Sequence, residues 1–201
     1  MKKRTYRISA AVGAVALAVV GVSTGVSFAG ESTAPAAVPA DAAAGQADSF
    51  LGGSLQVPDA LNPPAGNVLS AVFKASGVQI YGCTDSKWAL IEPAASLSGI
   101  TLNPVKRVTA LHFRGPSWES DQDGSLIEGT SPVSAPSDTP NSIPQLLVTA
   151  KNTRGPGIFG TVTFVQRLST VGGVAPAGGC TTGATTAAPY RAVYRFFVKK
   201  A

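Results

Sequence analysis

Histidine, cysteine and charged side chains are all scarce in this chain of 201 residues. It contains one histidine and two cysteines, and Asp, Glu, Lys and Arg together make up 13% of it. These numbers exclude a cysteine-built zinc site, a histidine-rich metal centre and a disulfide-dense mini-protein. Glycine and proline amount to about 18% of the residues, which is high for a helical protein but below the range of low-complexity disorder.

The net charge of +5 is concentrated at the N-terminus. Lys2, Lys3, Arg4 and Arg7 lie within the first seven residues, and the rest of the chain carries 12 basic and 11 acidic side chains. A nearly neutral body lacks the basic surface that attracts phosphate backbones. We therefore expect no nucleic-acid partner.

Residues 1–29 have the three-part pattern of a secretory signal peptide. A basic segment at 1–7 precedes an uncharged Ala-, Val- and Gly-rich segment at 8–26, and Ser27-Phe28-Ala29 supplies the small residues of a cleavage site. The pattern predicts a secreted, extracellular protein that contacts the membrane only through this peptide before cleavage. The alternative is an uncleaved single-span anchor, since the apolar segment is long enough to cross a bilayer.

Residues 30–55 form an Ala- and Pro-rich segment with little apolar surface to bury. Such a composition does not offset the entropy lost on ordering, so we expect a disordered linker. It could serve as a spacer, or it could simply be a disordered N-terminus of the mature protein.

Residues 56–201 are predicted to form one all-β domain, a compact sandwich or barrel. Short β-rich segments alternate there with Gly, Pro, Asn and Asp. The last segment shows the clearest period of two, with Tyr190, Ala192, Tyr194, Phe196 and Val198 on one face. The expected strands are 68–74, 78–84, 88–92, 105–114, 143–151, 158–168 and 190–199.

Cys83 and Cys180 are the only cysteines, and the chain is predicted to be exported. An even number of cysteines in an oxidising compartment favours a disulfide between them. This bond would hold the single domain together across 96 intervening residues.

Few residues suggest catalysis or metal binding. His112 could act as a general base with the nearby carboxylate of Glu119, although a lone strand histidine is more often a core residue. Asp121 and Asp123 resemble part of a calcium loop, but the bidentate glutamate of an EF-hand is replaced by Thr130. We therefore expect no cofactor, and a solvated turn is the preferred interpretation of the acidic cluster.

Three residues are candidates for binding. Trp118 could stack on a ligand, although tryptophan is more often simply buried. Arg191 and Arg195 lie in residues 139–201, which contain seven basic side chains and no acidic one. That asymmetry could suit an anionic envelope polymer, or it could protect exposed strand positions from pairing.

Several short motifs resemble a known family over most of the mature chain. They are Gln79-Ile80-Tyr81-Gly82-Cys83, Gly115-Pro116-Ser117-Trp118-Glu119, Val165-Gln166-Arg167-Leu168-Ser169-Thr170-Val171-Gly172-Gly173, and Tyr190-Arg191-Ala192-Val193-Tyr194-Arg195-Phe196-Phe197. Together they resemble the secreted bacterial and fungal proteins catalogued as domain of unknown function 3455. The resemblance implies a compact β-rich domain with a Cys83–Cys180 bridge, and it implies no established activity.

Three functions remain open from the sequence. The first is a non-enzymatic extracellular or envelope-associated domain that binds a polymer, a surface or a small ligand. The second is a structural envelope protein without a ligand. The third is a hydrolase or metal-dependent enzyme that uses His112 with the carboxylates near it.

Overall fold

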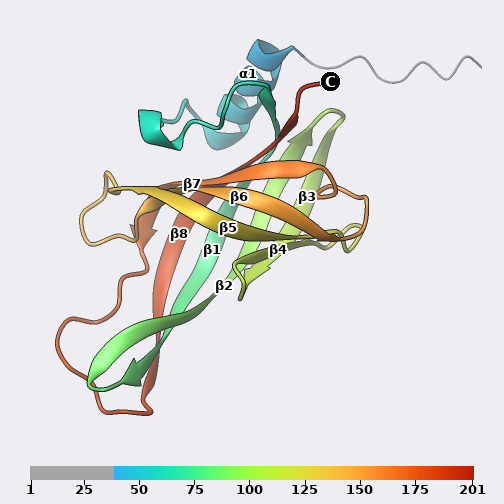
Figure 1. Cartoon of the computed structure of the whole chain (residues 1–201). Coiled ribbons are helices and arrows are strands. Elements are labelled where there is room, and N and C mark those ends of the chain that lie inside the picture. The colour runs from blue at the N-terminus through green and yellow to red at the C-terminus, as the bar shows by residue number, and fades with distance from the viewer. Residues whose placement is uncertain (1–38) are drawn as a thin grey trace, which may run out of the picture. The chain divides into compact units, whose positions relative to one another are not determined.

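The computed structural model describes residues 39–201, so the predicted signal peptide and the first part of the predicted linker lie outside it. Eight antiparallel strands follow one another in chain order and close into a barrel (Figure 1). The all-β prediction is therefore confirmed, and the architecture is the barrel rather than the sandwich. The strands are β1 (Asn67–Thr84), β2 (Lys87–Leu102), β3 (Val105–Phe113), β4 (Ser117–Ser120), β5 (Leu126–Ala135), β6 (Gln145–Arg154), β7 (Val162–Gly172) and β8 (Thr185–Lys199).

Each strand pairs with the next one along the chain, and the pairing of β1 with β8 closes the ring. β1, β2 and β8 are longer than the other strands, so together they project from one end of the barrel (Figure 1). The predicted disulfide between Cys83 and Cys180 is present near the tip of this projection. We call the projecting part of these three strands the extension.

The half of the barrel away from the extension is filled by aromatic side chains. Phe73 from β1 and Phe196 from β8 meet edge to face, with ring centroids 5.2 Å apart. Phe159, from the turn before β7, stacks on Phe196 at 4.7 Å. All three are fully buried, and they form part of one core cluster with the predicted inward face of β8. Burial of such large apolar rings is a major source of folding free energy.

The structure differs from the predicted disordered linker in its C-terminal part. Residues Ala40–Leu51 form helix α1, which ends at Gly52 in the left-handed conformation. Ala43 and Ala47, one helical turn apart, are buried against outward-facing β1 and β2 side chains such as Val72. The small alanines let the helix approach the barrel closely, and this contact supplies the stability that the composition alone does not.

A short 3₁₀ helix, η1 (Asp59–Leu61), covers another part of the outer surface. Leu61 is fully buried with Leu147 and Leu168, and its carbonyl accepts a 2.6 Å hydrogen bond from Gln166 Nε2.

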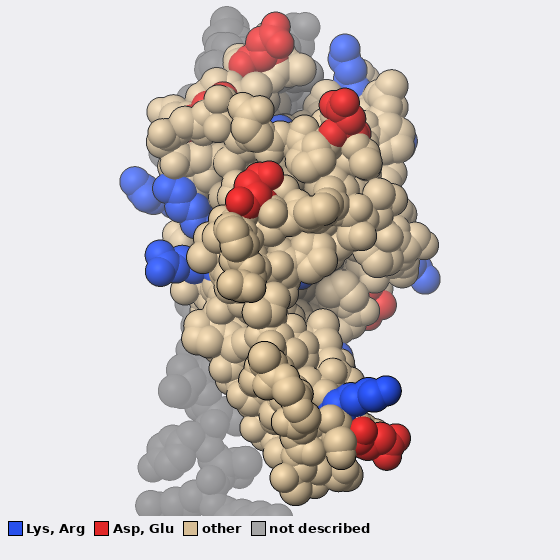
Figure 2. All heavy atoms as spheres, turned by 90° about the vertical axis from the view of Figure 1, so that its left-hand side faces the viewer, with Lys and Arg blue, Asp and Glu red and all other residues tan. Residues whose placement is uncertain are grey.

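Among residues 39–201, no helix combines the length and hydrophobicity needed to cross a bilayer. Most of the face drawn in Figure 2 is uncharged, with acidic and basic side chains in small groups.

Strand β7 departs from the alternation that its sequence suggests. The sequence pattern places Val162, Phe164 and Leu168 on one face, with Val165 and Arg167 on the other. A register irregularity between Val162 and Phe164 shifts the phase of the strand. Val162 and Val165 therefore both pack in the interior, while Leu168 faces outward toward η1. Such a bulge changes which face every later residue occupies.

Candidate functional site

The half of the barrel next to the extension contains a cavity of about 460 Å³. An eight-stranded barrel has an interior that side chains can just fill or that can hold one small ligand. Much of the wall is apolar. At its edge, Leu90 and Ile91 on the extension are 55% and 40% exposed. The apolar wall residues are Leu90, Ile91, Pro93, Leu146, Val148 and Val165.

An aromatic cluster forms one wall of this cavity. His112 on β3 lies directly opposite Trp118 on β4, and the antiparallel pairing places both side chains inside the barrel. Their rings are nearly parallel, with 5° between the planes and 4.5 Å between the centroids. Tyr194 on β8 meets His112 edge to face at 5.3 Å. The stacked pair therefore gives the wall a flat surface.

His112 is neutral in this environment. Its Nδ1 donates a 2.8 Å hydrogen bond to the carbonyl oxygen of Ser117, so Nε2 is the unprotonated nitrogen of the neutral ring. Burial lowers the pKa of His112 to about 4, because desolvation outweighs the opposing effect of the Ser117 carbonyl. The positive charge of Arg167 lowers it further. Near pH 7 the ring is thus an acceptor and not a cation.

Two buried donors in the cavity wall have no hydrogen-bond partner. They are Nε2 of Gln79 and Nε1 of Trp118, both on side chains about 2% exposed. A buried donor without a partner costs about 1–3 kcal/mol, so such groups in a native protein need an explanation. Both residues line the cavity through other atoms, whereas these two nitrogens have less than 1 Å² of accessible surface and lie behind the cavity wall.

Arg167 brings a positive charge to the same cavity. Its Nε and Nη2 donate to the carbonyl oxygen of Pro144 at 3.2 and 2.9 Å. Burial raises the pKa of Tyr194, and the charge of Arg167 opposes that shift. The hydroxyl of Tyr190 lies 3.3 Å from that of Tyr194, and its pKa is also raised by burial. Both tyrosines are therefore neutral, and Arg167 is the charged member of this group.

The structure does not bring His112 and Glu119 together. Glu119 pairs with Leu111 across β3 and β4, one position from the His112–Trp118 pair. Adjacent strand residues point to opposite faces, so Glu119 lies outside the barrel while His112 lies inside. The carboxylate forms an ion pair with Arg154. The predicted acid–base pair is therefore wrong in its geometry.

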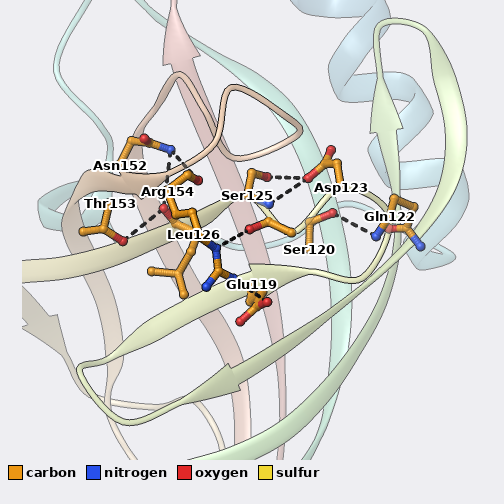
Figure 3. Close-up of polar contacts among 10 residues, drawn as sticks. Glu119, Ser120, Gln122, Asp123, Ser125, Leu126, Asn152, Thr153 and Arg154 are labelled. Atoms are coloured by element: carbon orange, nitrogen blue, oxygen red, sulfur yellow. Dashed lines mark hydrogen bonds and ion pairs between the residues drawn. The ribbon is translucent and has the colours of Figure 1, made fainter.

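Asp121 and Asp123 lie in the turn between β4 and β5. Figure 3 shows Asp123 in this turn, beside Ser125. Asp123 Oδ1 accepts hydrogen bonds from Ser125 N and Oγ, and its Oδ2 accepts a 2.8 Å bond from Ile158 N. Desolvation opposes ionisation of Asp123, but these bonds outweigh it and lower the pKa. Within residues 39–201, no three His, Cys, Asp or Glu side chains are grouped to hold a metal ion. Asp123 therefore links the turn between β4 and β5 to the turn that contains Ile158.

The three predicted binding residues do not share a surface. Trp118 is buried in the cavity wall, whereas Arg191 is exposed on the outer face of β8. Arg195 also faces outward, where its guanidinium lies 5.3 Å from the Phe197 ring centroid. Burial lowers the pKa of Arg195, and the charge of Asp48 on α1 opposes this shift. Arg195 therefore belongs to the contact between helix and barrel.

The sequence did not single out most of the cavity residues, among them Tyr194, Gln79 and Arg167. Tyr194 was on the face of the last strand that the period of two defines, and that position was the available indication of its role. Gln79 lies on β1 inside a predicted strand, where a polar residue gives no sign of facing inward. The inward position of Arg167 could not be predicted, because the irregularity in β7 changes which face the later residues of the strand occupy.

The fold and the cavity define the class of this protein, a closed eight-stranded antiparallel barrel with an internal pocket. A family model matches residues 64–198, and the chain belongs to this family, which is described as protein of unknown function (DUF3455). The match includes the cavity and nearly all of the barrel. Comparison with curated proteins gave no match, and comparison with solved structures gave none.

Proposed function

We propose that this protein is a secreted, non-enzymatic carrier or receptor that binds a small, largely apolar molecule inside the barrel. The observation that carries the proposal is the cavity itself, which has a volume of about 460 Å³ and a mostly apolar wall with few polar side chains, among them His112 and Arg167. Mostly apolar pockets of about 300–1,000 Å³ with a few convergent polar groups are typical of small-molecule sites.

Binding has better support than acid–base catalysis. A general base must reach a substrate proton and have a pKa close to the working pH. His112 has a pKa of about 4, and Glu119 lies on the other face of the sheet. The carboxylate that does line the cavity, Glu92, forms an ion pair with Arg114 at 3.3 Å. These groups are arranged to hold a molecule in place rather than to move protons.

Export is part of the proposal. The chain contains a disulfide between Cys83 and Cys180. Disulfides persist in oxidising compartments and are rare in reducing ones. The signal-peptide pattern at residues 1–29 supports the same location. The ligand would then be a molecule met outside the cytoplasm.

The test is titration with N-phenyl-1-naphthylamine, an uncharged fluorophore whose emission rises in apolar surroundings. We expect saturable binding to the purified mature protein, and loss of that binding in Leu146→Trp, which places a large ring in the cavity. Leu111→Trp is the matched control, because Leu111 points outward and is 46% exposed. Equal binding by both variants, or no binding by the native protein, would contradict the proposal and favour a structural envelope role.

A further inference from the structure

We propose that the cavity selects aromatic carboxylates, with Arg167 as the group that binds the carboxylate. This inference rests on the proposed function and adds the chemical class of the ligand. It follows from two features of the wall: a positive charge without a partner carboxylate, and a flat aromatic surface.

The charge in the cavity is unbalanced. Three charged residues line it, and two of them, Glu92 and Arg114, pair with each other. In the part of the chain that the structure describes, the other ion pair is Arg154–Glu119, on the outside of the barrel. Arg167 therefore has no carboxylate within ion-pair distance. A positive charge in the cavity wall attracts an anion, so an anionic ligand is favoured over a neutral or cationic one.

The neutral groups around Arg167 also suit a carboxylate. An ionised carboxylate is a pure acceptor with two oxygens, and the guanidinium of Arg167 is a pure donor. Guanidinium–carboxylate hydrogen bonds are stronger than neutral ones. His112 and Tyr194 add no negative charge near pH 7, since burial lowers the pKa of the former and raises that of the latter. Apart from Glu92, which is paired with Arg114, no side chain that lines the cavity is negatively charged.

The remainder of the cavity favours a flat, apolar body. The parallel rings of His112 and Trp118 give one wall its shape, and Leu146, Val148 and Val165 are among the apolar residues around the rest. Aromatic rings pack against such walls by stacking or by edge-to-face contact. The geometry thus points to a ligand with a ring system at one end and a carboxylate at the other.

The test compares 2-naphthoic acid, which is ionised at pH 7.5, with its uncharged counterpart 2-naphthamide, by calorimetric titration of the mature protein. We expect the acid to bind at least about tenfold more tightly, as charge-assisted hydrogen bonds require. Arg167→Gln should bring the two affinities within about threefold of each other by weakening the acid alone. Arg167→Lys, which keeps the charge, should retain part of the preference for the acid.

The outcomes separate this inference from the proposed function. Equal binding of acid and amide by the native protein, with N-phenyl-1-naphthylamine still bound, would overturn the carboxylate assignment and leave the cavity proposal intact. Failure of all three probes to bind would overturn both. If Arg167→Gln does not fold, as judged by circular dichroism, the acid-to-amide ratio of the native protein and of Arg167→Lys still decides the question.

Discussion

The two halves of the barrel interior are built from the same strands but contain different side chains. Along β1, Phe73 belongs to the packed half and Gln79 to the cavity half. Along β7, Val162 is followed by Arg167, and along β8 Phe196 is preceded by Tyr194. The comparison shows that stability and the cavity are located in different halves of the barrel. The packed half stabilises the fold, and the other half contains a cavity with polar groups.

The largest expected effect is on the packed half. Phe196→Ala removes a ring that contacts both Phe73 and Phe159, and it leaves a hole that the barrel cannot easily close. We expect a loss of about 3–5 kcal/mol in the free energy of unfolding, measured by urea denaturation. Leu111→Ala, on the exposed outer face, should cost less than about 1 kcal/mol. Similar losses for the two variants would mean that the packed half does not provide the stability assigned to it.

A second prediction concerns His112 and pH. Its folded pKa of about 4 lies below the ordinary value of 6.5, so between these values the unfolded chain binds a proton that the folded chain does not. The contribution of neutral His112 to the free energy of unfolding is therefore complete above pH 6.5, and it is lost as the pH falls toward 4. Between pH 7.5 and 4.0 the native protein should lose about 3 kcal/mol more than His112→Gln, as measured by urea unfolding at each pH. Parallel pH profiles would show that His112 is not held neutral by burial.

The smallest expected effect on stability comes from Gln79. Gln79→Met keeps a similar size and removes the unpartnered Nε2, so stability should stay constant or rise by up to about 1 kcal/mol in thermal or urea unfolding. A stability loss above about 2 kcal/mol would indicate that the Gln79 amide stabilises the fold.

The sequence predicted the β class, the disulfide and the set of β8 residues that share one face, because those features depend on alternation and on simple counting. It did not predict the second half of β2, or strands β4 and β5. These segments are rich in Ser, Gly and Pro, and their pairing comes from neighbouring strands rather than from local preference. Helix α1 was missed for a related reason, since Ala43 and Ala47 become a buried face only against the barrel.

The candidate site was less predictable than the fold. His112 and Trp118 were recognised as residues of interest, but their stacking depends on a strand register that the sequence does not specify. The proximity of Glu119 in sequence was misleading, because the alternating faces of a strand separate near neighbours. The unpartnered state of Gln79 and the inward position of Arg167 exist only in three dimensions.

The position of the disulfide has a consequence for how the ring closes. Pairing of β1 with β8 is the one strand contact that joins the two ends of the barrel sequence. Cys83 is near the end of β1, and Cys180 lies five residues before Thr185, which pairs with Gly82. In the oxidised chain the first and last strands therefore stay tethered even when unfolded. Closing the ring then resembles forming a local hairpin, with much less loop entropy to overcome.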